Sequence, residues 1–242
     1  MEASTQTSTG TSLDNATARE EICRIGRSLF ARGYVHATAG NISVRLNSSE
    51  GGGFLITPTD ACLGFLEPAR LALLDEDGVQ QGGDRASKTI ALHRRIYAAS
   101  LATAAPAHCI VHTHSSHCVG LTLDGVMCNA PQGRELLPAL TPYFVMKVGH
   151  VPLIGYAGPG ATEAADEVAA TIAKYHAAST AIRAVMLERL GPTVWHDTPA
   201  AAMATIEELE ETARLWALRT SKPAPLDEAQ IEELRVRFGA LW

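Results

Sequence analysis

Apolar residues recur at helical spacing in five stretches of the chain and alternate at strand spacing in several shorter ones. The predicted helices cover 17–32, 87–98, 161–176, 200–218 and 227–238. The predicted strands cover 42–46, 53–56, 71–74, 109–114, 184–187 and 193–195, with one or two more inside 144–154. Clusters rich in Gly, Ser, Asp and Pro separate these stretches, as expected of turns. The pattern predicts a single α/β domain in which helices cover a sheet.

The two ends of the chain differ from its middle. Residues 1–16 are polar and rich in Ser and Thr, so we expect a disordered N-terminal tail. Thr17 and Glu20 fit a capping box and predict the start of the first helix at Thr17. Near the other end, Asp227 is a suitable N-cap for a last helix after a proline-containing linker. The predicted organisation is a tail over 1–16, a domain over 17–221, and a linker with a helix over 222–242.

Charge and composition exclude several classes of protein. The formal net charge of -6, without a basic block, argues against nucleic-acid binding. No run of about 18 apolar residues predicts a membrane span, and the polar start does not resemble a secretory signal. The 5 Cys are odd in number and form no C-x-x-C pair. We therefore expect reduced thiols and a cytoplasmic location.

The segment from Cys109 to His114 carries the strongest chemical signal. Strand alternation places Ile110, His112 and His114 on one face. Two imidazoles at this spacing can hold one divalent metal ion, and Zn, Mn, Fe or Co would all accept them. A pair of hydrogen-bonded histidines on a sheet face is the alternative interpretation of the same pattern.

Three short segments are candidate anion binders. Gly40 and Asn41 stand at a strand entrance, where glycine allows close approach and the amide can donate a hydrogen bond. The hydroxyl groups of 57–59 could donate to a ligand oxygen. Ser87, Lys88 and Thr89 stand at a predicted helix start, which offers free N–H groups, hydroxyls and a cation. Each segment alone is equally compatible with an ordinary turn, strand end or helix cap.

Together, and in this order, the four segments resemble the class II aldolase/adducin superfamily. The resemblance runs from about residue 17 to 220. Within it, the chain is most similar to the 3-oxo-tetronate 4-phosphate decarboxylase group. That similarity rests on the segments 32–35, 56–59, 62–64, 141–146 and 207–213.

The resemblance implies a fold, a reaction and roles for particular residues. It implies an α/β/α domain with a central, mainly antiparallel sheet, assembled as a homotetramer with active sites between subunits. It implies a metal-dependent lyase that converts a phosphorylated 3-oxo sugar acid to dihydroxyacetone phosphate and CO2. The metal, usually zinc, would be held by His112 and His114. Substrate and phosphate would be bound by Gly40, Asn41, Thr59, Asp60, Ser87 and Lys88, and Tyr143 resembles a mobile catalytic tyrosine of the family.

Three positions depart from the family pattern. Thr89 stands where the family has its catalytic glutamate, and a threonine cannot act as a carboxylate base. Leu190 stands where the family has its third metal-binding histidine, and leucine cannot bind metal. Asp60 replaces a glycine near the expected phosphate, where Lys88 could offset its charge.

These departures leave three explanations open. The first is a site that lost its metal and its activity, as in a non-catalytic scaffold similar to the adducin head. The second is a substituted site, with a proton carrier at Lys88 or His117. The third is a different reaction in the same pocket, on another small hydroxy or oxo acid. The candidates for a substitute third ligand are Glu188, His150 and His196.

Overall fold

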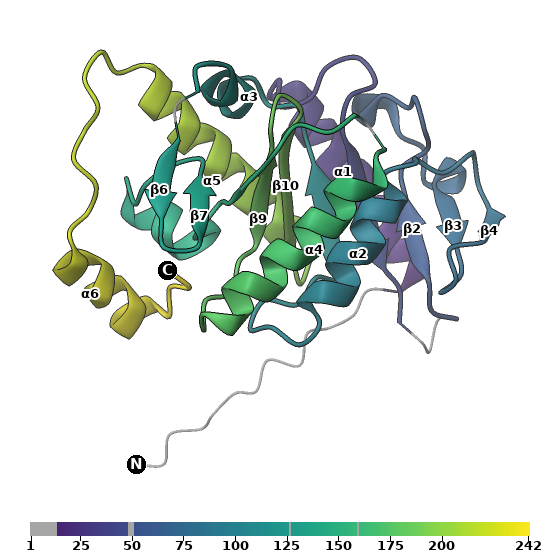
Figure 1. Cartoon of the computed structure of the whole chain (residues 1–242). Coiled ribbons are helices and arrows are strands. Elements are labelled where there is room, and N and C mark those ends of the chain that lie inside the picture. Colours follow the sequence, from purple (N-terminus) through teal and green to yellow (C-terminus); the bar gives the residue numbers. More distant parts are fainter. Residues whose placement is uncertain (1–13, 48–50, 126, 159) are drawn as a thin grey trace, which may run out of the picture.

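The structure is a computed structural model that describes residues 14–47, 51–125, 127–158 and 160–242. The expected tail over 1–16 falls mostly on residues outside this part. Within the described ranges, no helix is both long enough and apolar enough to cross a membrane. Figure 1 shows one layered body, with helices on either side of a central sheet.

Eight strands form the central sheet in the order β4-β3-β2-β1-β5-β10-β9-β8. All neighbouring strands are antiparallel except β8 and β9, which are parallel. The mainly antiparallel sheet is therefore confirmed. The strand bounds are β1 Asn41–Arg45, β2 Phe54–Ile56, β3 Ala72–Leu74, β4 Gln80–Gly82, β5 Cys109–His112, β8 Leu153–Ile154, β9 Ala184–Leu187 and β10 Gly191–His196. A separate hairpin joins β6 (Cys128–Ala130) to β7 (Gly133–Glu135).

Helices cover both faces of this sheet (Figure 1). Helices α2 (Ile90–Ser100) and α4 (Thr162–Ala177) pack against each other over one face. Helices α1 (Asn15–Ala31) and α5 (Pro199–Ala217) cover the other face, together with the short α3 (Ser116–Leu123). Helix α6 (Glu228–Phe238) packs through Ile231 and Leu234 against the turn of helix η4 (Phe144–Val148).

The central strand β5 shows how the sequence pattern builds both layers. Val111 belongs to the core under α1 and α5, whereas Ile110 belongs to the core under α2 and α4. Because side chains alternate along a strand, His112 follows Ile110 onto the α2 and α4 face. Strands β1 and β10 flank β5 on its two sides, so this histidine lies in the middle of the sheet.

Several predicted boundaries are wrong. Helix α1 begins at Asn15 and its N-cap is Asp14, whose carboxylate accepts a hydrogen bond from the Thr17 amide. Helix α2 begins only at Ile90, so Ser87 is not its N-cap. Of the one or two strands expected inside 144–154, β8 (Leu153–Ile154) is confirmed, whereas Phe144–Val148 is a helical turn, because a short apolar run fits either structure. The capping box at Asp227 is confirmed, with Gln230 at N3.

The structure also contains elements that the sequence pattern did not predict. Helix α3, the β6–β7 hairpin and the edge strand β4 are all short. Two further single turns of 3-10 helix, η2 (Leu63–Phe65) and η3 (Pro68–Arg70), connect β2 to β3. Elements of three to eight residues contain too few apolar positions to establish a period, and so they escape pattern analysis.

Candidate functional site

A cavity of about 170 Å³ lies on the α2 and α4 face, near the end of β5. Its apolar wall includes Leu92, Leu187 and Leu190, and small residues between 155 and 164 close another side. Its polar wall is formed by Asn41, Lys88, Thr89, His112, His114 and Glu188. The cavity thus brings together the histidine motif, part of the predicted anion-binding set and the candidate third ligand.

His112 is held by strands on both of its sides. In the sheet register it faces Asn41 of β1 and Thr193 of β10. Its Nδ1 atom lies 3.1 Å from the carbonyl oxygen of Pro192 and 2.9 Å from Oγ1 of Thr193. A carbonyl can only accept, so this contact places the ring proton on Nδ1 and leaves the lone pair of Nε2 for a ligand. Burial lowers the pKa of His112 to about 3, so the ring is neutral and suited to metal binding.

His114 lies just beyond the end of β5 and completes the pair. The centroids of the His112 and His114 rings are 5.1 Å apart, with the ring planes at 73°. Burial and the neighbouring His36 both lower the pKa of His114. Two imidazoles that share one tetrahedral zinc ion have ring centres about 5 Å apart, given Zn–N distances of about 2.0–2.1 Å. The spacing of the two rings is therefore compatible with a shared divalent ion.

A third protein ligand is not in place beside this pair. No group of three His, Cys, Asp or Glu side chains in the described ranges is arranged to hold a metal ion. Leu190 lines the cavity as an apolar residue. Glu188 also lines it, and its Oε2 atom accepts a hydrogen bond of 3.1 Å from the Tyr156 amide.

The other two candidate ligands lie elsewhere. His150 contacts the buried carboxylate of Glu135 through Nδ1, at 2.9 Å, and stacks on Trp242. His196 pairs with Cys109 at the opposite end of β5 from His112. Neither residue lines the cavity, so the structure does not support either of them as a third metal ligand.

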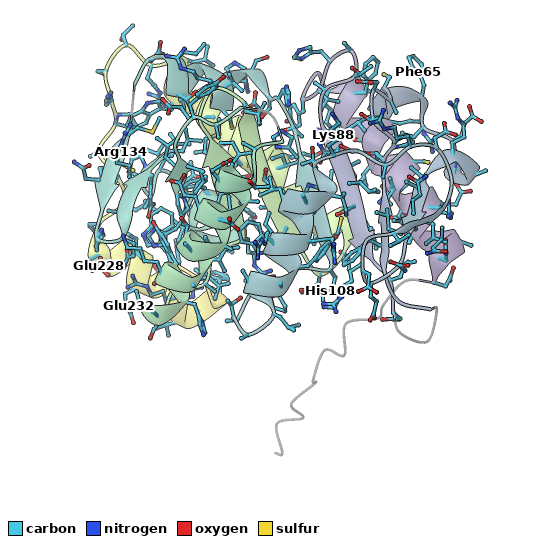
Figure 2. All side chains as sticks on the ribbon, turned by 45° about the vertical axis from the view of Figure 1, so that its right-hand side comes forward. Phe65, Lys88, His108, Arg134, Glu228 and Glu232 are labelled. Atoms are coloured by element: carbon cyan, nitrogen blue, oxygen red, sulfur yellow. The ribbon has the colours of Figure 1, made fainter. Side chains whose placement is uncertain are left out.

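The segment 87–89, predicted to bind an anion, forms a hydrogen-bonded turn before α2, and its residues Lys88 and Thr89 line the cavity. The Asn41 amide donates to the hydroxyl of Thr89 at 3.2 Å, and the hydroxyl of Ser87 donates to the same oxygen at 3.3 Å. Thr89 is the N-cap residue of α2, because the helix begins at Ile90, but its side chain makes no capping hydrogen bond. Lys88 stands between these two residues in the sequence, lines the cavity and carries an ammonium group; its position is labelled in Figure 2. This cluster offers hydroxyl, amide and ammonium groups to an anionic substrate.

The remaining predicted substrate-binding residues do not line the cavity. Thr59 lies beside the same turn, since its amide donates to the Arg85 carbonyl at 2.8 Å. Asp60 has a left-handed φ of 56° and faces a separate hollow. Gly40 has a φ of 85°, and a Cβ there would lie 2.9 Å from the His112 carbonyl oxygen. Tyr143 is 63% exposed at the start of η4. Their assigned roles stay predictions.

Two buried polar atoms near the cavity have no partner in the described part of the chain. One is Oδ1 of Asn41, which lines the cavity, and the other is Nε2 of His93. His93 is fully buried, and its Nδ1 lies 2.7 Å from Oγ of Ser43, which in turn lies 2.8 Å from the Tyr97 hydroxyl. Burial lowers the pKa of His93 to about 3. A buried acceptor without a hydrogen bond lowers the stability of the fold. The Asn41 oxygen is therefore available to accept a hydrogen bond from a ligand hydroxyl.

His36 is the residue near this site that sequence reasoning missed. Its ring centroid lies 6.4 Å from that of His114, in an edge-on arrangement at 73°. It belongs to no motif and to no predicted strand or helix. Only the fold brings it to the end of β5, so no local sequence signal could have identified it.

Comparison with known proteins identifies the family. The family described as Class II Aldolase and Adducin N-terminal domain matches residues 20–217. A 3-oxo-tetronate 4-phosphate decarboxylase of Cupriavidus necator is 49% identical over 93% of this chain and 97% of that protein. A protein of the same name from Escherichia coli K12 is 36% identical over 90% of this chain and 94% of its own length.

Solved structures agree with this result. The structure of YgbL from Klebsiella pneumoniae has a TM-score of 0.78 and 36% identity, and covers 92% of this chain and 100% of that chain. An L-fuculose 1-phosphate aldolase has a TM-score of 0.74 at 21% identity, which supports the fold alone. It covers 93% of this chain and 97% of that chain. The chain belongs to the class II aldolase and adducin N-terminal domain family.

Proposed function

We propose that this protein is a 3-oxo-tetronate 4-phosphate decarboxylase, a carboxy-lyase that releases CO2 and forms dihydroxyacetone phosphate. The observation that carries the proposal is the cavity that joins the His112 and His114 pair to Lys88, Asn41 and Thr89. Relatives of that name align over nearly their whole length, at up to 49% identity among those compared.

The chemistry requires an electron sink and a way to hold a substrate that carries both a carboxylate and a phosphate. A divalent ion, most simply zinc, would be held by His112 and His114 and would supply the electrophile for the substrate carbonyl. Lys88, Ser87 and Asn41 bind and orient the phosphate end, and Lys88 is the candidate proton carrier. The bond between the carboxylate carbon and its neighbour breaks, CO2 leaves, and one proton then returns to that neighbouring carbon.

The threonine at position 89 suits decarboxylation better than aldol cleavage. Aldol cleavage requires a base to take a proton from a hydroxyl group, whereas loss of CO2 begins from the carboxylate that is already ionised. Thr89 offers a neutral hydroxyl in hydrogen-bond contact with Asn41. A negative charge at that position would repel the carboxylate of a sugar acid. Other small 3-oxo acids with a phosphate remain within the same substrate class.

A non-catalytic scaffold is the second candidate, and Leu190 is the observation that favours it. This residue gives the cavity wall an apolar side chain where the family pattern expects a metal ligand. Under this alternative the chain would fold and assemble but would neither bind a metal ion nor turn over substrate. Metal content and turnover of the purified protein separate the two proposals.

The decisive experiment measures decarboxylation of 3-oxo-tetronate 4-phosphate that is generated enzymatically. The product, dihydroxyacetone phosphate, is detected by a second enzyme that reduces it. The protein is assayed as purified, after chelation, and after reloading with zinc, manganese, iron or cobalt. We expect turnover that is lost on chelation and restored by one of the ions. A folded protein without turnover under every condition would contradict the decarboxylase and favour the scaffold.

The proposal includes a homotetramer with active sites between subunits. Tyr143 is exposed and does not line the cavity of its own chain. A neighbouring subunit would place this tyrosine at the site. We therefore expect His112→Ala and Tyr143→Phe to be weakly active alone and to regain activity when mixed and reassembled. If the mixed and reassembled variants are no more active than each variant alone, the proposal of active sites shared between subunits is contradicted.

The proposal also places the protein in the cytoplasm, in a reducing environment. All five cysteines lie in the described ranges, and each is a free thiol. Cys23, Cys109 and Cys118 are buried, and burial raises the pKa of each thiol. These thiols are therefore protonated and unreactive, as expected of structural cysteines.

A further inference from the structure

The cavity has an apolar wall to which the proposed chemistry gives no role. Leu92 of α2 and Leu187 of β9 line this wall together with Leu190, which lies in the turn between β9 and β10. All three side chains pack in the core cluster on the α2 and α4 face of the sheet. We call these three residues the leucine wall.

The position of Leu190 in the leucine wall is fixed by hydrogen bonds on both sides. Its own amide donates to the Leu187 carbonyl at 3.1 Å and closes the turn between the two strands. The amide of Arg189 donates to the hydroxyl of Thr122 on α3, also at 3.1 Å. The Leu190 side chain is therefore held against the cavity by the sheet and by a neighbouring helix.

The backbone donors around this wall are already bonded within the chain. The Glu188 amide donates to the Ile154 carbonyl at 3.0 Å, and the Tyr156 amide donates to the Glu188 carboxylate at 3.1 Å. On the opposite side of the cavity, the Ala161 amide donates to the Gly158 carbonyl at 3.0 Å. These amides have no hydrogen bond left to give to a ligand.

Charge is distributed unevenly over the cavity. Among the described residues that line it, Lys88 is the only lysine or arginine, and Glu188 is the only carboxylate. A ligand with two anionic groups can therefore pair one of them with Lys88. The second group, placed at the leucine wall, meets apolar side chains and a negative charge, which disfavour an ionised group.

The proposed substrate has two such groups at its two ends. It carries the phosphate on C4, the ketone at C3 and the carboxylate at C1. This step rests on the proposed function, in which Lys88 binds the phosphate and the ketone lies at His112 and His114. The carboxylate then extends beyond the histidine pair, and the leucine wall is the part of the lining left to receive it.

We propose that the leucine wall is the subsite of the departing carboxylate and that Leu190 is a specificity-determining residue for decarboxylation. The C1–C2 bond breaks, its electron pair passes into the C3 carbonyl, C1 leaves as CO2, and C2 then takes up one proton. The reactant carboxylate is charged, whereas CO2 is neutral. An apolar wall therefore disfavours the reactant more than the transition state, and phosphate binding at Lys88 offsets that cost.

The test compares two ligands by titration calorimetry on the full-length protein. Erythronate 4-phosphate carries both anionic groups but has a hydroxyl in place of the ketone, so it cannot lose CO2. Dihydroxyacetone phosphate lacks the carboxylate. The variants are Leu190→Asn, Leu190→Met and, as a matched control, Leu123→Asn at a residue that is 56% exposed at the end of α3. Circular dichroism melting establishes that each variant is folded, and Leu190→Thr replaces Leu190→Asn if the latter does not fold.

We expect Leu190→Asn to bind erythronate 4-phosphate roughly tenfold more tightly, since its amide can donate one hydrogen bond to the carboxylate. Its affinity for dihydroxyacetone phosphate should be unchanged. Its kcat should fall by about tenfold, because that hydrogen bond stabilises the charged reactant and is lost as CO2 forms. Leu190→Met, which keeps an apolar side chain of similar volume, and Leu123→Asn should resemble the unmodified protein.

Tighter binding together with slower turnover is a result that structural damage does not produce. The proposal is overturned if Leu190→Asn leaves both quantities unchanged, if it weakens the binding of erythronate 4-phosphate, or if it alters the binding of both ligands equally. It is also overturned if the unmodified protein binds neither ligand. Binding of both ligands without turnover by the unmodified protein would contradict the decarboxylase, whereas the comparison of the two ligands would still decide where Leu190 lies.

Discussion

Asn41 on β1 and His112 on β5 face each other directly across the antiparallel pair. Residues that are paired in this way project from the same face of a sheet. The same register that builds the core therefore places an amide with an unpartnered oxygen beside an imidazole whose Nε2 is available. The two groups that would receive the ligand come from the most central strands, where the backbone is held on both sides.

Replacement of His112 by alanine should remove both the metal ion and turnover. The variant leaves only one imidazole of the pair, and we expect activity to fall by at least about 100-fold. Inductively coupled plasma mass spectrometry and the coupled decarboxylation assay check the two effects on one sample. His108→Ala, at the exposed residue directly before the same strand, is the control. Full turnover in His112→Ala would contradict the metal-dependent mechanism.

Replacement of Lys88 by methionine should weaken substrate binding, and it should also lower kcat because Lys88 is the candidate proton carrier. A hydrogen bond to a charged group contributes about 1.5–3 kcal/mol, which corresponds to a rise in KM of roughly 10- to 100-fold. Steady-state kinetics at two salt concentrations measure the effect, since screening should reduce the difference. Lys174→Met, whose ammonium group contacts the Gln132 carbonyl, is the matched control. An unchanged KM accompanied by lost kcat would assign Lys88 to proton transfer alone and contradict its role in binding the phosphate.

The buried His93 should make the folded state sensitive to acid. Its pKa is lowered to about 3 by burial, from an ordinary value of 6.5. Below pH 6.5 His93 takes up a proton in the unfolded chain but stays neutral in the folded chain. The free energy of unfolding therefore falls as the pH drops from 6.5 towards 3. The expected slope is about 1.4 kcal/mol per pH unit for one such group.

Urea unfolding of the chelated protein at pH 7, 6 and 5 measures this slope. His93→Asn keeps an amide where Nδ1 contacts Ser43 but cannot titrate in this range. The slope of this variant should be smaller by the contribution of one histidine. Equal slopes in the two proteins would mean that His93 takes up its proton over the same pH range in the folded and the unfolded chain, contrary to the lowered pKa expected from its burial.

Replacement of Gly191 by alanine should destabilise the sheet at the site. Gly191 has a φ of 143°, and a Cβ there would lie 2.0 Å from the Thr113 carbonyl oxygen. The added Cβ should push β10 away from the end of β5. This should lower the free energy of unfolding by roughly 3 kcal/mol and displace His114. Thermal melting measures the loss.

Gly120→Ala is the control for this substitution. Gly120 lies inside α3 with open space around its Cα, so alanine should raise stability by about 0.5–1 kcal/mol. A melting temperature of Gly191→Ala equal to that of the unmodified protein would mean that the two strands can separate without cost at this point.

The sequence predicted the features that depend on local geometry. Alternation along 109–114 placed His112 on the face of Ile110, and the structure confirms this because the pleat of a strand is a local property. The resemblance to the aldolase family supplied the sheet type and the family itself, both of which are confirmed.

The features that the sequence missed depend on contacts between distant segments. His36 and His114 are 78 positions apart in the printed numbering, and only the β1–β5 pairing brings them together. Ser87 has the composition of an N-cap, yet pairing of its segment with Thr57 keeps it extended and delays the helix to Ile90. The apolar run at 144–148 has no clear period, so the expectation of one or two strands inside 144–154 is confirmed only for β8, and 144–148 is a helical turn.

The strand order has a consequence for how this scaffold can change over evolutionary time. His112 lies on a central strand, whereas positions 89 and 190 lie on two separate connections at the rim of the cavity. A lineage can exchange the residue on either connection by a single mutation while the interior of the sheet stays the same. The reaction that this fold catalyses can therefore change separately from its core. Carboxylate or imidazole side chains could be introduced at positions 89 and 190 without changes to the interior of the sheet.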